Sequence, residues 1–461
     1  MSDNNFESNA YTVKEKEVTQ TNQTVSRNPN YSSQRIDIRK INKYQFVTEA
    51  YEGSAGFCDG SYLLPHAREA WYQERQTMSY YRNYIRPITN AIVDPVFDSP
   101  VLRETDSELY KAFLQDVDVA GTNINDHVRE VVRFSRLHGN CFVVMENFAD
   151  QPDSMQEAIN NRILPYVYIQ PAYTVYDYTA DQFGNLVTIT FHHTESYVDK
   201  NDKKKTVVVY KTWTDMDLTI VKKDGNTVVS HEIIPHDLGI LPVIQAPAVG
   251  KEILPFAPFY DISRINYAIF NKDSEIRDQE RAQAFSILYI QTDAPQNGIV
   301  LGPHNAIILP ASDQINITPG FVSPDSSILK TLVENNKELV DAMFKAAQQQ
   351  GVVAIKQATS GIAEAYRFTG TNAQLNKSAT IATSYENDLV KLFNIRTNQN
   401  IEYTVRYSKE YSPAISAQNI DLIVKLLDME INDAAKTEIR NVLIKEVLSH
   451  LDQEDIDKLL N

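Results

Sequence analysis

Two long helical patterns, separated by a short strand-rich insert, constrain the fold of this chain more than any other sequence feature. At about 1.5 Å per residue, the first pattern, from Pro258 to about Phe285, predicts a helix about 40 Å long. Isoleucines recur in it at helical spacing among charged residues: Ile262, Ile265, Ile269 and Ile276 among Arg264, Lys272, Glu275, Arg277, Asp278, Glu280 and Arg281. A helix that is polar on most sides is not buried alone, so this one needs neighbours along its length.

The second pattern begins at Ser323-Pro324-Asp325, which supplies an N-cap and a first-turn proline, and it ends near Gln350. One stripe of it is apolar: Ile328, Leu329, Leu332, Val333, Leu339, Val340, Met343, Phe344 and Ala347. Four short runs with strand composition lie between the two patterns: Ile287–Ile290, Gly298–Leu301, Ala306–Leu309 and Ile315–Thr318. One compact monomer cannot cover both helices, whereas packing against copies in a closed ring would.

The composition is that of an ordinary soluble globular protein, with 43% hydrophobic and 23% charged residues among 461. That length suggests two to four domains. No apolar run approaches the roughly 18 residues of a membrane span, and the first 25 residues lack the apolar core of a signal peptide, so we expect neither export nor membrane insertion. Cys58 and Cys141 are far apart and lack metal-type spacing, which favours two inert thiols in a reducing compartment.

Before the long helices, the pattern predicts an arm, then helices, then strands. Residues 1 to about 35 are polar and are expected to be a flexible arm. Three helices are predicted, at Tyr62–Val93 with a bend near Pro87, at Asp106–Val117 and at Asn125–Leu137, and the last leads through Gly139 to a strand at Cys141–Met145. Six further strands are expected in an antiparallel meander: Leu164–Gln170, Thr174–Tyr178, Leu186–His193, Thr206–Thr212, Leu218–Lys222 and Thr227–Ile234.

After the long helices, small and polar residues from Gly351 to Gly370 predict a loop. A helix follows at Asn372–Phe393, a short strand at Asn400–Tyr407, and a C-terminal helical block at Ser416–Met429, Asp433–Leu448 and Gln453–Leu460. The predicted fold class is therefore α+β.

No motif for catalysis is present: the phosphate loop, the dinucleotide glycine fingerprint, the zinc helix and the nucleophile elbow are all absent from the sequence. His192 and His193 are adjacent in a predicted strand, so they point to opposite faces, and we expect one packed and one exposed histidine. Glu275, Asp278 and Glu280 are acid/base or metal candidates, but mixed charges on a long helix are more typical of a solvated or inter-subunit face.

The formal net charge of −16 disfavours tight binding of DNA phosphates through a general basic surface. It would suit a surface past which DNA slides, although acidity also keeps an ordinary protein soluble. Three basic residues lie in or beside the 351–370 interruption: Lys356, Arg367 and Lys377. If that loop lines a channel, these residues would touch phosphates singly, in a weak and salt-dependent contact.

Several stretches, taken in order, resemble the portal proteins of tailed bacteriophages. They are residues 81–93 (an early helix), 138–144 (a helix, glycine and strand step), 238–244 (the run Leu-Gly-Ile-Leu-Pro-Val-Ile before the first long helix), 258–271 (the first long helix), 301–310 and 359–363. Together they cover about residues 60 to 461, and their order is the specific part of the resemblance.

The resemblance implies a portal fold: a wing of helices and an antiparallel β meander, two long stem helices, a small α/β clip, a tunnel loop and a short helical crown. The implied ranges are an arm at 1–35, the wing at 36–257, stem helices at 258–285 and 325–350, the clip at 286–324, the tunnel loop at 351–370, a wing helix and strand at 371–412, and the crown at 413–461.

The function implied is a head-to-tail connector, a ring of about twelve copies at one capsid vertex of the virion, assembled in the host cytoplasm. It would pass double-stranded DNA during packaging and ejection. It would bind the terminase large subunit and later the neck or adaptor proteins, contact the major capsid and scaffolding proteins, and need no membrane, cofactor, metal or catalysis of its own.

Three sets of residues are implied by these domains. The channel would be lined by Lys356, Gln357, Thr359, Ser360, Arg367 and Lys377. The clip would contact terminase or neck proteins through Gln291, Asp293, Gln296, Asn297, His304 and Asn305. The stem helices would meet between subunits through Arg264, Glu275, Arg277, Asp278 and Arg281. Two alternatives stay open: a metal-dependent nuclease or hydrolase using the acidic residues at 275–280, and a cytoplasmic oligomeric binding module with no DNA partner.

Overall fold

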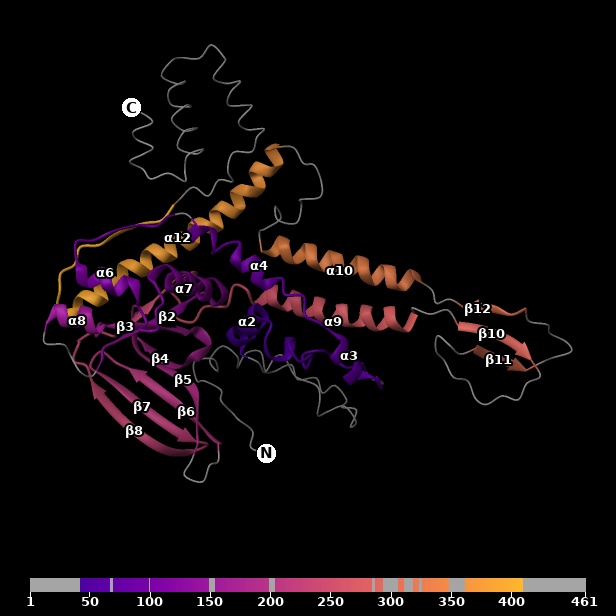
Figure 1. Cartoon of the computed structure of the whole chain (residues 1–461), viewed down its shortest axis with the longest axis horizontal. Helices are drawn as coiled ribbons and strands as arrows, with labels where there is room; N and C mark the ends of the chain where they lie inside the picture. The colour runs from indigo at the N-terminus through magenta and orange to yellow at the C-terminus, as the bar shows by residue number, and fades with distance from the viewer. Residues whose placement is uncertain are drawn as a thin grey trace, which may run out of the picture. The chain divides into compact units, whose positions relative to one another are not determined.

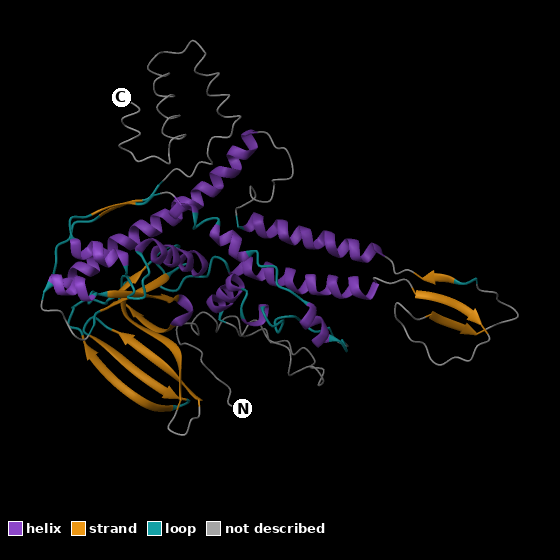
Figure 2. Cartoon of the chain, viewed as in Figure 1, coloured by secondary structure: helices purple, strands orange, loops and turns teal. Residues whose placement is uncertain are grey.

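The computed structural model describes residues 42 to 408, with gaps at 67–68, 99, 149–153, 199–203, 284–286, 293–305, 311–317, 323–325 and 348–360. The chain divides into two compact units, Met1–Tyr407 and Ser408–Asn461, and nearly all described residues belong to the first. The predicted N-terminal arm and C-terminal helical block lie outside the described residues. Helices and mostly antiparallel strands make up the first unit (Figure 2), which confirms the α+β class.

The first described helix, α2 (Lys43–Glu52), was not predicted from the sequence. The Asn42 side chain caps it by accepting a hydrogen bond from the Tyr44 backbone N–H at 2.9 Å. Gly53, in the left-handed conformation, ends it. The helix buries Phe46, Val47 and Ala50, which explains why a segment with only moderate helical signals is ordered.

The single helix predicted for Tyr62–Val93 is wrong. Two short helices lie in this range, α3 (Tyr72–Met78) and α4 (Ile85–Asn90). A 3-10 turn, η2 (Ala55–Phe57), precedes the range and a further short helix, α5 (Pro95–Asp98), follows it. Residues 79–84 between α3 and α4 are not helical, because their side chains are bonded elsewhere: Tyr81 donates to the Ala50 carbonyl at 3.0 Å and Asn83 to the Tyr51 carbonyl at 2.7 Å. Pro87 lies in the first turn of α4, where a missing N–H costs nothing, and causes no bend in a longer helix.

The next helices and the first sheet are α6 (Glu108–Gln115), α7 (Ile124–His138), β2 (Cys141–Glu146), α8 (Met155–Asn161), β3 (Tyr166–Pro171), η3 (Ala172–Thr174) and β9 (Val243–Gln245). Of these, α6, α7, β2 and β3 match predicted elements, whereas α8, η3 and β9 were not predicted. In the sheet of order β3-β2-β9, the central strand β2 is almost entirely buried. Gly139 joins α7 to β2 with a positive φ of 89°, and an added Cβ there would come within 2.7 Å of Pro255.

A five-stranded antiparallel meander confirms most of the predicted β region. Its strands pair in chain order: β4 (Val175–Ala180), β5 (Leu186–Val198), β6 (Lys204–Trp213), β7 (Asp217–Asp224) and β8 (Thr227–Pro235). The first predicted strand of the six belongs instead to the other sheet, as β3. Phe191 of β5 packs on Phe142 of β2, with ring centroids 5.9 Å apart, so the two sheets share a core.

The two long helices are present, and they lie side by side (Figure 1) as α9 (Tyr260–Gln283) and α10 (Ser326–Ala346). Between them in sequence stands a small sheet of order β11-β10-β12, made of β10 (Ile287–Thr292), β11 (Ala306–Pro310) and β12 (Gly320–Val322). Two of the four strands predicted in this insert are confirmed, as β10 and β11. The run at 298–301 lies outside the described residues, as does most of 315–318, and β12 was not predicted.

The last described helix, α12 (Gly361–Thr397), corrects the loop predicted for residues 351–370. Residues 361–370 are helical, and residues 351–360 lie outside the described residues. Alanines and other good helix formers between 361 and 370 outweigh the two glycines that suggested a loop. Strand β13 (Thr404–Arg406) follows and pairs antiparallel with β1 (Leu102–Glu104).

A buried polar cluster holds the second half of α12 to these two strands. Glu386 on α12 is fully buried and accepts two hydrogen bonds from the Arg103 guanidinium of β1, at 2.8 and 2.9 Å. The hydroxyls of Tyr403 and Tyr407, beside β13, donate to the same carboxylate. Both oxygens of this carboxylate have donors, so its burial is compatible with a charge.

Candidate functional site

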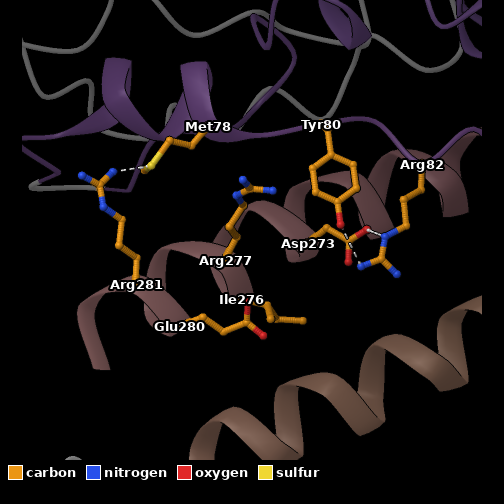
Figure 3. A pocket seen from close by; sticks show the side chains of 8 residues that line it. All are labelled: Met78, Tyr80, Arg82, Asp273, Ile276, Arg277, Glu280 and Arg281. Atoms are coloured by element: carbon orange, nitrogen blue, oxygen red, sulfur yellow. Dashed lines mark hydrogen bonds and ion pairs between the residues drawn. The ribbon is translucent and has the colours of Figure 1, made fainter. Parts of the chain in front are cut away.

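The charged part of α9 faces a hollow of about 450 Å³ beside the end of α3 (Figure 3). Residues 78–82 form one wall and α9 forms the other, and the lining consists of Met78, Tyr80, Arg82, Asp273, Ile276, Arg277, Glu280 and Arg281. Three arginines and two carboxylates therefore meet in one partly open space.

Two guanidinium groups approach the ring of Tyr80, which lines the hollow. The Arg277 guanidinium carbon lies 5.2 Å from the ring centroid and that of Arg82 lies 5.7 Å from it. These distances are within the range of cation–π attraction. The Tyr80 side chain nevertheless remains 50% exposed, so this pair of contacts faces solvent.

Asp273 forms the floor of the hollow and links three segments. Its Oδ1 accepts a hydrogen bond from the side-chain amide of Asn336, on α10, at 2.7 Å. Its Oδ2 lies 3.2 Å from Arg82 Nε, as an ion pair that is not aligned as a hydrogen bond. Burial raises the pKa of Asp273, although Arg82 and Asn336 act in the opposite direction. The residue therefore holds α9, α10 and the 80–82 segment together at some cost in desolvation.

The outer end of the hollow is held by weaker, exposed contacts. Arg281 forms an ion pair with Glu74 of α3 at 2.9 Å and also contacts the sulfur of Met78. Both partners of the ion pair are about half exposed, so the pair adds little stability.

The five predicted inter-subunit charges do not converge on one place. Arg277 and Arg281 line the hollow. Arg264 is exposed above the Tyr260 ring at 6.0 Å, Glu275 lies 3.7 Å from the imidazole of His66, and Asp278 is exposed. Sequence reasoning missed Tyr80, Arg82, Asp273 and Asn336. One signal was available: Asp273 occupies a position of the apolar stripe of α9, where a carboxylate requires a specific partner.

Among the six predicted channel residues, Lys356, Gln357, Thr359 and Ser360 lie outside the described residues. Arg367 and Lys377 are both on α12, not on a loop, and Lys377 is exposed. Of the predicted clip residues, Gln291 lies on β10 and is partly exposed, whereas Asp293, Gln296, Asn297, His304 and Asn305 are outside the described residues.

The apolar stripe of α10 is only partly covered. Met343 is fully buried, but Ile328 is 56% exposed. The other described members of the stripe are partly exposed: Leu329, Leu332, Val333, Leu339, Val340, Phe344 and Ala347. Among the described residues, α10 packs mainly on α9, with Phe344 also beside the Tyr84 ring, and part of this apolar surface stays in contact with water, which is unfavourable for a stripe of this length.

The histidine pair differs from its prediction, because both side chains are partly exposed. His192 donates from Nδ1 to the Thr174 carbonyl at 3.0 Å, while His193 lies 3.1 Å from the Glu195 carboxylate. Within the part of the chain that the structure describes, no group of three His, Cys, Asp or Glu residues is placed to hold a metal ion. No helix there is long and apolar enough to cross a membrane.

Comparison with known proteins gives structural likenesses only. No family model and no curated protein matches the sequence. The fold is similar to a chain in the virion of a native gene transfer agent particle, with a TM-score of 0.40, 10% identity, and coverage of 89% of this chain and 99% of that one. Two further chains are similar. One is from the neck of the native particle computed with C12 symmetry (TM-score 0.38, 12% identity, 78% and 89% coverage), and the other from the neck of the empty particle computed with C6 symmetry (0.38, 10%, 84% and 95%). Because each TM-score is below 0.5, these likenesses carry no conclusion about function.

Proposed function

We propose that this chain is a phage portal protein. It assembles as a ring of about twelve copies at one vertex of a capsid and passes double-stranded DNA during packaging and ejection. It binds the terminase large subunit, then neck or tail proteins, and contacts capsid and scaffolding proteins. The ordered resemblance of residues 60–461 to portal proteins supports this assignment, and it is an assignment of a structural role, not of catalysis.

The observation that carries the proposal is the uncovered apolar row on α10. Ile328 and its neighbours on the stripe would lose contact with water if the helix pair of the next copy packed against them. Such a contact joins two different surfaces, so it repeats head to tail, and it closes as a ring when the rotation between neighbouring copies is a whole fraction of a turn. Each copy then contributes its pair of helices, α9 and α10, to the wall of the ring.

The charge of the chain fits a channel for DNA. At a net charge of −16, the wall repels phosphates and disfavours lasting contacts, so a duplex can slide. Arg367 and Lys377 on α12, with Lys356, Gln357, Thr359 and Ser360 before it, are proposed to touch the backbone singly. Gln291 of β10, with the five neighbouring polar residues predicted for the clip, is proposed to contact terminase and neck proteins.

Electron microscopy and mass photometry of the purified chain test the proposal. We expect closed rings with an open axis at micromolar concentration. The double substitution Ile328→Asp with Leu332→Asp should convert rings to folded monomers, because it places two charges in the apolar contact. The control, Ile328→Leu with Leu332→Met, keeps the surface apolar and should keep the rings.

Two outcomes would count against this assignment in different ways. If the unmodified chain forms only monomers or dimers at every salt concentration, the portal assignment fails. If it forms rings that survive the double aspartate substitution, α10 is not the contact between subunits. Circular dichroism of each variant separates loss of assembly from loss of folding.

A further inference from the structure

The edge strand β8 is exposed along its whole length. All nine of its residues, Thr227–Pro235, are exposed. Among the described residues, β8 has a neighbouring strand on one side only, since it ends the sheet of order β4-β5-β6-β7-β8. Four of its large apolar side chains are between 41% and 57% exposed: Val228, Val229, Ile233 and Ile234. They lie on both faces of the sheet, because neighbouring residues of a strand point to opposite sides.

Such an edge is normally protected. Exposed edge strands are usually short, or carry lysine, an interior proline or a bulge that stops a further strand from pairing. β8 has no lysine, its one proline is its last residue, and the bulge in its pairing with β7 lies near the hairpin end. Its outward N–H and C=O groups therefore offer a template for another strand.

The two faces of β8 favour side chains of opposite charge on a neighbouring strand. Glu232 shares a face with Lys222 of β7, but Lys222 already pairs with Glu195 at 2.7 Å, and within the described residues Glu232 has no ion pair. On the other face, His231 shares the surface with Lys223. A strand beside β8 would match both faces if it had cations on the Glu232 side and carboxylates on the His231 side.

We propose that residues 11–25 of this same chain add to β8 as a sixth, outermost strand of the sheet. These residues lie outside the described residues, and their sequence meets the requirement. Lys14-Glu15-Lys16-Glu17 alternates, so a strand would place both lysines on one face and both glutamates on the other. The first 28 residues contain no glycine or proline, and seven of residues 11–25 are threonine or valine, which favours a strand.

The connecting segment is long enough for the chain to reach its own sheet. A hollow of about 520 Å³ is lined both by Gln45 and Thr48 of α2 and by His192 of β5, so the start of α2 lies beside β5. β8 is three strands away from β5, a distance of about 14 Å at the usual strand spacing. A connection of the length of residues 26–41 can span at most roughly 55 Å, so its length does not prevent the pairing. The pairing does not require the proposed ring.

Disulfide cross-linking tests the pairing in the full chain. In a Cys58→Ser background, cysteine is placed singly at each of positions 13 to 18 and combined with either Ile233→Cys or Glu232→Cys. Opposed residues of paired strands have the separation that a disulfide requires. We expect the odd positions to cross-link to Ile233→Cys and the even positions to Glu232→Cys, with yields at least fivefold higher than those of the opposite parity. Peptide mapping after non-reducing electrophoresis identifies the products.

Each outcome decides the inference. Cross-linked products of monomer size with odd–even alternation support it. Absence of products, or equal yields at odd and even positions, overturns it. Products of dimer size would show that the segment pairs with a second copy, which overturns the assignment to the same chain. In hydrogen exchange, removal of residues 1–25 should increase the exchange of the β8 amides at least tenfold, and unchanged exchange contradicts the pairing.

Discussion

The Glu386 cluster and the α9 hollow use the same kinds of side chain in opposite ways. Each combines arginine, a carboxylate and tyrosine. In the cluster, Arg103 and two tyrosine hydroxyls saturate a carboxylate that water cannot reach. In the hollow, Tyr80 is half exposed between two arginines, and Arg277 has no ion pair within the described residues. The first arrangement is complete within one chain, whereas the second leaves charge available to another molecule.

The largest expected effect comes from breaking the closed cluster. Glu386→Ala leaves the Arg103 guanidinium, which is mostly buried, without its carboxylate. Removing one partner of a buried ion pair typically costs 3 to 5 kcal/mol, so we expect the free energy of unfolding to fall by about 4 kcal/mol in urea denaturation. The control Lys391→Ala removes an exposed helical ion pair with Asp388 and should cost less than about 0.5 kcal/mol. Equal losses in the two variants would contradict the comparison.

The second-largest effect is expected from acid, which should lower the free energy of unfolding through two buried histidines. Burial lowers the pKa of His127 to about 4, against a smaller effect of Asp118, and burial lowers the pKa of His138 to about 3. Both folded values lie below the ordinary value of 6.5, so the unfolded chain binds more protons as the pH falls below 6.5, and stability is lost in that window. Between pH 7 and pH 5 we expect a loss on the order of 2 kcal/mol for each histidine.

Replacing His127 with glutamine should remove about half of this pH dependence, since the new side chain does not titrate. Glutamine retains a group that can hydrogen bond to the Tyr385 hydroxyl, which lies 2.7 Å from His127. Denaturation midpoints at pH 5, 6 and 7 measure the effect. An unchanged slope would exclude His127 as its source.

Asp273 lies between the two extremes, because it is buried but belongs to the hollow. The pKa of Asp273 is higher in the folded protein than in the unfolded chain, so its negative charge at neutral pH lowers the free energy of unfolding. This loss of stability develops as the pH rises from the unfolded-state pKa to the folded-state pKa. We expect Asp273→Asn to raise the free energy of unfolding by up to about 1 kcal/mol at pH 7. Asp273→Ala should lower it by about 1 to 3 kcal/mol, because the buried amide of Asn336 loses its acceptor. Thermal unfolding of both variants measures the difference in sign.

The smallest effect is expected at the outer end of the hollow. Arg281→Ala removes an exposed ion pair with Glu74 and should change the free energy of unfolding by less than about 0.5 kcal/mol. If the free energy of unfolding of the monomer fell by more than about 1.5 kcal/mol, the contacts of the hollow would stabilise the fold in the same way as the Glu386 cluster.

Sequence periodicity predicted the regular parts of this molecule well. The meander from β4 to β8 has alternating strands and clear turns, and α7, α9 and α10 have long apolar stripes, so local pattern and burial agree. The pattern failed at residues 62–93 because Tyr81 and Asn83 bond to α2, a contact between segments about 30 residues apart that helical spacing does not reveal.

The sites were harder to predict than the elements. Sequence reasoning named Arg277 and Arg281 as charges between subunits. Both line the hollow, but Tyr80 and Arg82, which line it with them, lie about 200 residues earlier in the chain. The Glu386 cluster was missed for the same reason, since Arg103 is 283 residues from its carboxylate. Short-range spacing carries no information about such pairs, although a carboxylate on an apolar stripe, as at Asp273, indicates that a partner exists.

The continuity of α12 has a mechanical consequence. Its 37 residues correspond to a rod about 55 Å long. The later half of the rod is clamped: Ser378 donates to the Ile92 carbonyl at 2.6 Å, Glu386 holds Arg103, and Arg396 donates to the Met145 carbonyl at 2.7 Å. A force applied to the helix near Gly361 therefore acts as a torque on these three contacts. It is transmitted to the strands that contain Arg103 and Met145, because no break in the helix lies between.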